Sequence, residues 1–264
     1  MKRSSTSSNF QPGLLSGRSA LITGGGTGIG AAAAELLSAA GAKVSLLGRR
    51  LEPLQEVAGK VGGAAIRCDV TDRDSIAGAF EEARAANGPI DLLIVNAGIA
   101  ESAPFHKMTR EGWDRIISVN LTGAFDTVQA GLPDLLKAED ARVVFIASVA
   151  SLRGVPYAAH YAASKHGLLG LMRSMAAEYA KSKMTVNAIC PGYVDTPMTD
   201  QSVARVSQIT GRGEGDARSA ITNMNASGRL VDPKAIGNLV LTLCLPLSRD
   251  INGAAVTIDG GTSA

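Results

Sequence analysis

Short apolar runs alternate with amphipathic stretches along almost the whole chain. The apolar runs are nearly continuous in hydrophobic residues, which is typical of strands buried on both faces of a parallel sheet. The stretches between them have helical spacing, and Gly41 ends the first one. We predict strands at 19–23, 43–47, 64–68, 91–95, 142–147, 185–190 and 254–258, helices at 52–60, 72–86, 110–137, 160–181 and 233–245, and an alanine-rich helix that ends at Ala40.

This alternation predicts an α/β fold, a single-domain Rossmann-type doubly wound parallel sheet flanked by helices. Right-handed crossovers place the carboxyl ends of the strands on one edge of the sheet, and ligands bind along that edge. The loops that follow the strands are therefore expected to carry the functional residues. We assign residues 14–264 to one catalytic domain. Residues 1–13 are rich in serine and lack an apolar segment, so we interpret them as a mobile N-terminal tail.

One stretch, residues 199–229, breaks the pattern. It has no strand signal and contains a glycine-rich run at 211–215. Connections of this length are usually lids or partly disordered segments. Because it follows the sixth predicted strand, we predict a lid-like segment that covers the site.

Composition narrows the classes of protein that fit. The chain has 264 residues, of which 45% are hydrophobic and 19% charged, as expected for a chain with a substantial core. A formal net charge of +2 gives no argument for nucleic acid, and no apolar run is long enough to span a membrane. The histidines and cysteines have no metal-ligand spacing, so we expect no metal. We expect a cytoplasmic protein whose thiols are buried and structural, at Cys68, Cys190 and Cys244.

A glycine-rich turn follows the first predicted strand and opens a helix. Gly24 permits the tight turn, Gly28 lets the backbone approach a pyrophosphate, and Gly30 lets the helix pack on the strand. The helix start that contains Thr27 and Ile29 supplies amide donors to the phosphates. A glycine-rich turn alone is weak evidence for nucleotide binding, but the place of this turn in a βαβ unit favours dinucleotide binding.

The second predicted strand ends in Gly48, Arg49 and Arg50. A site that prefers NAD usually has a carboxylate here for the ribose hydroxyls, whereas guanidinium groups bind a 2′-phosphate. We therefore favour NADP(H) as cofactor, with NAD(H) possible. The alternative is that both arginines are solvated surface charges.

Two further strand ends carry candidate cofactor contacts. Asp69 and Val70 follow the third strand, where the carboxylate either caps its own turn or accepts from the adenine amino group. Asn96, Ala97 and Gly98 follow the fourth strand, and their small size leaves room for a ligand against the backbone. An ordinary turn is the alternative for that trio.

Tyr161 and Lys165 lie near the start of the helix predicted at 160–181. A spacing of four places them on one helix face, one turn apart. An ammonium near a phenol is expected to lower the tyrosine pKa from about 10 and to favour acid–base chemistry near neutral pH. The alternative is an ordinary amphipathic helix face.

Taken together and in this order, these motifs resemble the short-chain dehydrogenase/reductase family over about residues 17–261, similar to its NADP-type members. The resemblance implies the strand order 3-2-1-4-5-6-7, a homotetramer and a four-residue catalytic set. In that set Asn120 resembles the residue that holds a water near the lysine, and Ser148 the residue that hydrogen-bonds the substrate oxygen. Tyr161 resembles the proton donor, and Lys165 the residue that binds the nicotinamide ribose.

The same resemblance extends to the segment after the sixth strand and to the substrate. Pro191 and Gly192 begin a segment that is similar to the one that fixes the nicotinamide carboxamide, through the Val194 backbone and the Thr196 hydroxyl. Ketoreductases of 3-oxoacyl thioesters and polyketides are similar over residues 164–198. We expect the pocket wall to include Ser148, Ala150, Tyr157 and Tyr193.

The resulting hypothesis is an oxidoreductase that moves a hydride between NADP(H) and a ketone or secondary alcohol, with a 3-oxoacyl thioester or another hydrophobic ketone as substrate. One alternative is an NAD-dependent secondary-alcohol dehydrogenase. An alternative of another class is a dinucleotide-binding sensor without catalytic activity. The intact set of Asn120, Ser148, Tyr161 and Lys165 argues against that sensor.

Overall fold

A computed structural model describes residues 13–264 and contains one sheet of parallel strands in the order β3-β2-β1-β4-β5-β6-β7, which confirms the expected topology. The predicted tail, residues 1–13, lies outside the described residues except for Gly13. The strands are β1 (Ser19–Thr23), β2 (Lys43–Gly48), β3 (Ala64–Arg67), β4 (Leu92–Val95), β5 (Ala141–Ile146), β6 (Met184–Pro191) and β7 (Ala255–Ile258). The helices are α1 (Gly28–Ala39), α2 (Leu51–Val61), α3 (Arg73–Asn87), α4 (Arg110–Ile117), α5 (Gly123–Leu135), α6 (Ala159–Glu178), α7 (Pro197–Thr210), α8 (Glu214–Thr222) and α9 (Pro233–Cys244).

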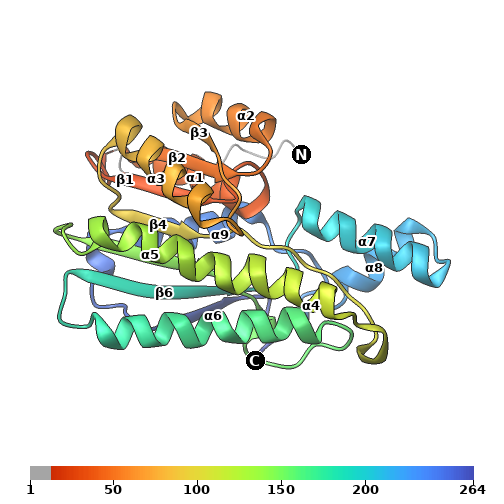
Figure 1. The fold of residues 1–264 in the computed structure, drawn as a ribbon. Helices are drawn as coiled ribbons and strands as arrows, with labels where there is room; N and C mark the ends of the chain where they lie inside the picture. The colour runs from red at the N-terminus through yellow and green to blue at the C-terminus, as the bar shows by residue number, and fades with distance from the viewer. Residues whose placement is uncertain (1–12) are drawn as a thin grey trace, which may run out of the picture.

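Helices cover both faces of the sheet (Figure 1). One core cluster joins the strands to α3, α5 and α6, and the other joins them to α1, α2 and α9. The central strands β1, β4 and β5 are buried at every position, as their largely apolar sequences predict. All the strand pairs are parallel, so the carboxyl ends of the strands share one edge, which we call the carboxyl edge.

The helical stretch predicted at 110–137 is interrupted. A π-helical segment, Ser118–Thr122, separates α4 from α5 and contains the buried Asn120. Single π-turns within α-helices are frequent at functional sites. The sequence prediction of one continuous helix was therefore wrong at this point.

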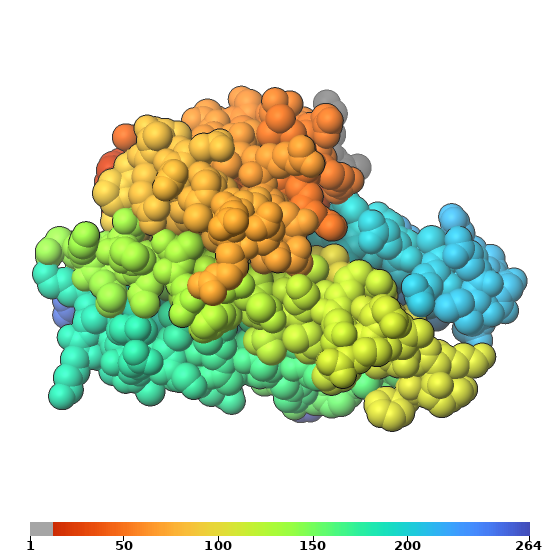
Figure 2. Space-filling model, in the orientation of Figure 1, coloured from red at the N-terminus to blue at the C-terminus, as the bar shows by residue number. Residues whose placement is uncertain are grey.

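The segment predicted as a lid, 199–229, folds into most of α7 and all of α8. The two helices enclose a small cluster of Val203, Ala217 and Ile221, against which Tyr193 packs. Val194 and Val231 form an isolated parallel bridge between the segment that follows β6 and the segment that precedes α9. In Figures 1 and 2, α7 and α8 project beyond the carboxyl edge as a separate lobe. We call this unit the α7–α8 lobe.

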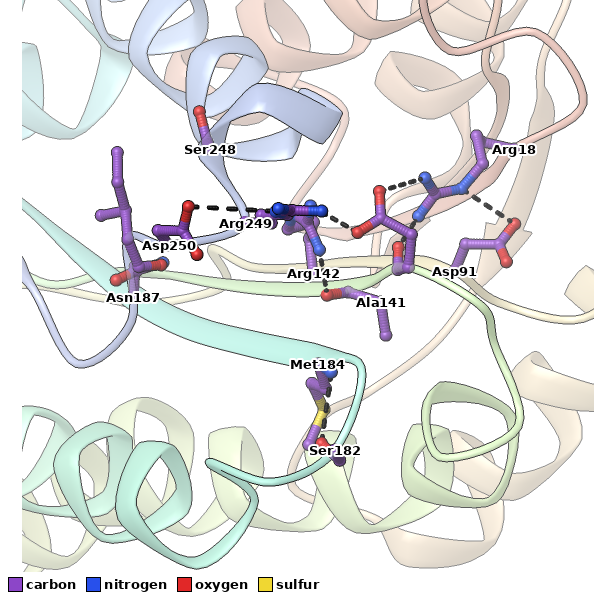
Figure 3. Close-up of polar contacts among 12 residues, drawn as sticks. Arg18, Asp91, Ala141, Arg142, Ser182, Met184, Asn187, Ser248, Arg249 and Asp250 are labelled. Atoms are coloured by element: carbon purple, nitrogen blue, oxygen red, sulfur yellow. Dashed lines mark hydrogen bonds and ion pairs between the residues drawn. The ribbon is translucent and has the colours of Figure 1, made fainter.

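The opposite edge, where the strands begin, carries a network of ion pairs (Figure 3). The Asp140 carboxylate lies 3.1 Å from Arg18 Nη1 and 2.5 Å from Arg142 Nη2. Asp91 accepts from the Ser19 amide at 2.9 Å and lies 3.7 Å from Arg18 Nε. The Arg142 side chain is only 1% exposed, and a buried guanidinium is tolerated when it is paired in this way.

The structure tests two expectations that came from the composition, the state of the cysteines and the lack of a membrane span. Cys68, Cys190 and Cys244 are buried free thiols, as predicted. Among residues 13–264, no helix is both long enough and apolar enough to cross a membrane.

Candidate active site

The glycine turn between β1 and α1 has the shape that a bound pyrophosphate needs. Gly24 and Gly28 have φ angles of 66° and 55°, which favour glycine. A Cβ added at Gly30 would lie 2.3 Å from the Gly24 carbonyl oxygen, so only glycine fits there. The first turn of α1, which contains Ile29 and follows the exposed Thr27, has no acidic residue. Its amides are therefore suited to an anion, and this cradle fits a dinucleotide.

The trio after β4 holds the glycine turn in place. Asn96 Nδ2 donates to the Thr23 and Gly24 carbonyls at 2.8 and 3.1 Å. The amides of Asn96 and Ala97 both donate to Thr23 Oγ1 at 3.0 Å. Asn96 therefore braces the cradle, a role that sequence reasoning had not assigned to its side chain. Gly98 lies close to Asn120 and Lys165, because an added Cβ would lie 3.3 Å from Asn120 Oδ1 and 3.6 Å from Lys165 Nζ.

The residues expected around the adenosine lie at the ends of β2 and β3. Gly48 is partly buried, while Arg49 and Arg50 are exposed. Asp69 Oδ1 accepts from the Thr71 amide at 3.0 Å and from Thr71 Oγ1 at 2.8 Å, so this oxygen caps its own turn. These bonds lower the pKa of Asp69, and the charge of Arg49 also contributes. Arg49 therefore lies near the Asp69 turn.

Val70 is buried and packs against the start of α5. It is 9% exposed, and a Cβ added at Gly123 would lie 2.5 Å from the Val70 carbonyl oxygen. The Val70 contact thus connects the loop after β3 to the start of α5, which directly follows the segment that contains Asn120.

The Asn120 amide group is fully buried and its orientation is set by its partners. Oδ1 accepts from the Ile99 amide at 2.8 Å, and Nδ2 donates to the Ile99 carbonyl at 3.0 Å. Nδ2 also donates to Ser164 Oγ at 3.1 Å, whose hydroxyl donates to the Tyr161 carbonyl at 2.7 Å. A chain of hydrogen bonds therefore links the loop after β4 to the first turns of α6. Sequence reasoning missed Ser164, although its place directly before Lys165 could have indicated it.

Tyr161, Ser148 and Lys165 meet at the carboxyl edge. Ser148 Oγ accepts from the Ala150 amide at 3.1 Å, which leaves its own proton free to donate. Burial raises the pKa of Tyr161 to about 12, and a hydrogen bond with Ser148 offsets part of this rise. The expected pKa below 10 was wrong for this arrangement, because burial outweighs the opposing influences.

Lys165 is buried and points toward the sheet. Its Nζ donates to the Ile146 carbonyl at 3.0 Å and lies 5.7 Å from the centroid of the Tyr161 ring. Burial lowers the pKa of Lys165 to about 8. The buried Cys190 side chain lies near Lys165, and sequence reasoning had not placed it there.

The segment after β6 meets the glycine turn from the other side. The methyl group of Thr196 would lie 2.9 Å from a Cβ added at Gly28, so the two residues are in close approach. Val194 is buried, and the Gly192 backbone lies close to the buried Asn225. Pro191 ends β6 and is also buried. The expected carboxamide segment and the pyrophosphate cradle therefore lie side by side.

The other residues expected in the pocket wall differ in solvent exposure. Ala150 is buried, whereas Tyr157 is 65% exposed and has a φ of 65°, which is strained for a residue other than glycine. The Tyr157 carbonyl accepts from the Ala103 amide at 2.8 Å, which ties this loop to the segment after β4. Tyr193 is close enough to Tyr161 to affect its pKa.

Comparisons with known proteins agree with this geometry. A family model described as short chain dehydrogenase matches residues 18–207. Oxidoreductase UcpA of Salmonella typhimurium is 37% identical over 260 residues, covering 95% of this chain and 96% of UcpA. The 3-oxoacyl-[acyl-carrier-protein] reductase MabA of Mycobacterium tuberculosis is 35% identical over 244 residues, with 92% of each chain covered.

A solved structure is similar over the same extent. A variant of actinorhodin polyketide ketoreductase, crystallised with NADPH, superposes with a TM-score of 0.90 at 30% identity, covering 96% of this chain and 99% of the other. This chain therefore belongs to the short-chain dehydrogenase/reductase family, oxidoreductases that act on CH–OH groups with a nicotinamide dinucleotide as cofactor.

Proposed function

We propose that this protein reduces a hydrophobic ketone to a secondary alcohol with NADPH, with Tyr161 as the proton donor. The observation that carries the proposal is the meeting of the Tyr161 and Ser148 hydroxyls beside a glycine turn that fits a dinucleotide. The pKa of about 12 keeps the Tyr161 phenol protonated near neutral pH, so it has a proton to give. The likeness to MabA and to a polyketide ketoreductase supports a 3-oxoacyl thioester as one substrate of this kind.

The chain's own groups each have a part in this reaction. A nicotinamide bound at this edge supplies the hydride that the carbonyl carbon receives. Ser148 and Tyr161 donate hydrogen bonds to the carbonyl oxygen, and Tyr161 delivers its proton as negative charge grows there. The Lys165 ammonium stabilises the tyrosinate that remains. A water near Asn120 returns the proton.

The cofactor would be held by the residues already placed along the carboxyl edge. Gly24, Thr27, Gly28, Ile29 and Gly30 cradle the pyrophosphate. Lys165 binds the nicotinamide ribose, and the Pro191–Thr196 segment fixes the carboxamide. Arg49 and Arg50 bind the 2′-phosphate, Asp69 and Val70 lie beside the adenine, and Asn96, Ala97 and Gly98 lie under the adenosine ribose.

Steady-state NADPH oxidation over a panel of ketones tests the reaction. The panel contains aryl ketones, cyclic ketones, sugars and 3-oxoacyl thioesters. Tyr161→Phe should lower kcat by about 10²–10⁴-fold, the usual contribution of a positioned general acid. Thermal stabilisation by NADPH checks that the variant still folds and binds cofactor. Retention of more than a few per cent of activity by this variant would overturn the proton-donor role.

Cofactor preference has a separate test at Gly48. A Cβ added there would lie 3.5 Å from the nearest atom, a Leu54 methyl carbon, so a side chain fits. Gly48→Asp should repel a 2′-phosphate and accept from ribose hydroxyls, which shifts the ratio of kcat/KM values toward NADH by about tenfold to a hundredfold. A wild-type protein that prefers NADH would instead support the NAD-dependent alcohol dehydrogenase.

A further inference from the structure

A serine hydroxyl joins Asn120 to the helix that carries Tyr161 and Lys165. Asn120 belongs to the π-helical segment between α4 and α5, whereas the other two residues belong to α6. In Figure 1, α4 and α5 run alongside α6. Ser164 lies on α6 directly before Lys165, and its Oγ accepts from Asn120 Nδ2 at 3.1 Å. Both residues of this bond are fully buried, where an unpaired polar group is costly.

The Ser164 hydroxyl can form this bond in one sense only. A hydroxyl has a single proton, and Ser164 donates it to the Tyr161 carbonyl at 2.7 Å. Its oxygen is therefore an acceptor toward the amide, and the amide must present its NH₂ group. The Ile99 backbone imposes the same orientation, since Asn120 Oδ1 accepts from the Ile99 amide at 2.8 Å and Nδ2 donates to the Ile99 carbonyl at 3.0 Å. Both hydrogens of Nδ2 are thus used.

Ile99 and Ser164 determine different properties of the Asn120 side chain. Ile99 lies in the loop after β4, so its two bonds orient the amide without any connection to α6. Ser164 is itself bonded to the backbone of Tyr161, so its bond sets where the amide lies relative to the first turn of α6. The serine therefore fixes the position of Asn120, while Ile99 fixes which way the amide faces.

The same region of α6 also packs closely on the π-helical segment. Gly167 lies one helical turn beyond Ser164, and a Cβ added there would lie 2.7 Å from a Leu121 methyl carbon. Leu121 directly follows Asn120 in the sequence. This apolar contact does not depend on the serine hydroxyl. Removal of the hydroxyl should therefore release the Asn120 side chain without separating the two elements.

The carbonyl oxygen of the Asn120 side chain lies near Lys165. A Cβ added at Gly98 would lie 3.3 Å from Asn120 Oδ1 and 3.6 Å from Lys165 Nζ, so both atoms border the same point. Oδ1 has a second lone pair beyond the one that the Ile99 amide uses. A water that contacts both atoms can donate to Oδ1 and accept from the Lys165 ammonium.

We propose that Ser164 is a positioning residue, whose hydroxyl holds Asn120 at the place from which a water returns the proton to Tyr161. This inference rests on the proposed ketone reduction. In that reaction the ketone receives a hydride from the nicotinamide and a proton from Tyr161, and the tyrosinate regains a proton from solvent through this water and Lys165. Ser164 itself neither gains nor loses a proton.

Removal of the hydroxyl tests the proposal. Ser164→Ala should lower kcat for ketone reduction about tenfold, as expected when one buried hydrogen bond is lost. The KM for NADPH should stay within about twofold, because the glycine turn is unchanged. Ser164→Cys keeps the size of the side chain but accepts only weakly, so its kcat should lie between those of the wild type and Ser164→Ala. A kcat equal to that of the wild type in both variants would overturn the proposal.

Thr127→Val is the matched control. Thr127 is 1% exposed, and its Oγ1 donates to the Gly123 carbonyl at 2.6 Å, so this bond stays within α5. The variant loses a buried hydroxyl that bonds a helix carbonyl, as Ser164→Ala does, and should keep kcat within about twofold. An equal fall in kcat in Thr127→Val and Ser164→Ala would indicate a general loosening of the helices and contradict the proposal.

A double-mutant cycle determines whether Ser164 acts through Asn120. Once Asn120→Ala has removed the amide, Ser164→Ala should lower kcat no further, because the two residues share one interaction. A serine with a purely structural role would lower kcat by the same factor in both backgrounds. A further tenfold fall in the Asn120→Ala background would therefore overturn the proposal.

Hydrogen exchange at the Ile99 amide separates this inference from the proposed function. If the wild type reduces no ketone, the proposed function fails, and exchange alone then decides the positioning of Asn120. The Ile99 amide donates to Asn120 Oδ1. Its exchange should become about tenfold faster in Ser164→Ala and stay unchanged in Thr127→Val. Exchange at Ile99 that is unchanged in Ser164→Ala would overturn the inference.

Discussion

Two asparagine side chains fix the backbone of the site at the residue scale. Asn96 braces the glycine turn, and Asn120 holds the Ile99 backbone through both of its amide atoms. Asn96 was predicted as functional from its place after a strand, and Asn120 from the family resemblance. Their hydrogen-bond partners come from segments far away along the chain, so no local pattern could reveal them. The same holds for the Tyr161 pKa, which depends on burial by the whole fold.

Lys165 gives a prediction at this scale. Its pKa of about 8 means that the ammonium is intact at pH 6–7 and is lost as the pH rises. The kcat/KM for ketone reduction at saturating NADPH should therefore be level at low pH and fall above about pH 8. Lys165→Arg should have a lower plateau without this fall, because a guanidinium stays charged. A wild-type profile that stays level to pH 10 would contradict the prediction.

At the scale of elements, periodicity predicted the strands closely and the irregular helices poorly. The π-helical segment Ser118–Thr122 has no helix breaker, and its geometry goes together with contacts from Asn120 to Ile99 and Ser164. The sequence analysis missed helices α7 and α8 although the sequence contains helix-boundary residues for α7. Pro197 begins α7, Gly211 ends it in a left-handed conformation, and both are usual boundary signals.

Packing of α1 against α9 gives a prediction at the element scale. A Cβ added at Gly237 would lie 2.9 Å from the backbone of Ala32, so the two helices would have to separate. Gly237→Ala should lower the free energy of unfolding by about 1–3 kcal/mol. Gly59→Ala in α2 is the control, because nothing lies within 4 Å of an added Cβ there. That variant should be neutral or more stable by about 0.5–1 kcal/mol. Denaturant unfolding measures the free energy of unfolding of both variants. Equal changes in the two variants would contradict the close packing of α1 against α9 at Gly237.

At the scale of the molecule, the two ends of the strands differ: one carries the candidate catalytic residues and the other a network of ion pairs. The carboxyl edge collects the loops that carry Asn120, Ser148, Tyr161 and Lys165, while the opposite edge is held by the Arg18, Asp91, Asp140 and Arg142 network. The alternation of elements predicted a parallel sheet, but the strand order came from the family resemblance, because alternation alone permits several orders. The homotetramer and the cytoplasmic location remain predictions.

The attachment of the α7–α8 lobe gives a prediction at this scale. Asn225, which is 1% exposed, accepts from the Tyr193 amide at 2.9 Å and donates to the Tyr193 and Arg229 carbonyls at 2.8 Å each. Asn225→Ala should loosen the lobe, since it leaves buried backbone groups unpaired, at a cost of about 1–3 kcal/mol. Amide hydrogen exchange in 197–222 should become about tenfold faster or more, with exchange in β1 unchanged. Equal acceleration in both would indicate global destabilisation instead.

The bridge between Val194 and Val231 has a consequence for how far the length of the peptide between them can vary. The bridge holds the two ends of the intervening peptide together, so residues added or removed at its exposed turn, 211–213, need not disturb the sheet or Thr196. The entropy of closing such a loop grows only slowly with its length. The turn between α7 and α8 should therefore tolerate changes in length, whereas Thr196 and Asn225, which lie in the same peptide, should not tolerate replacement.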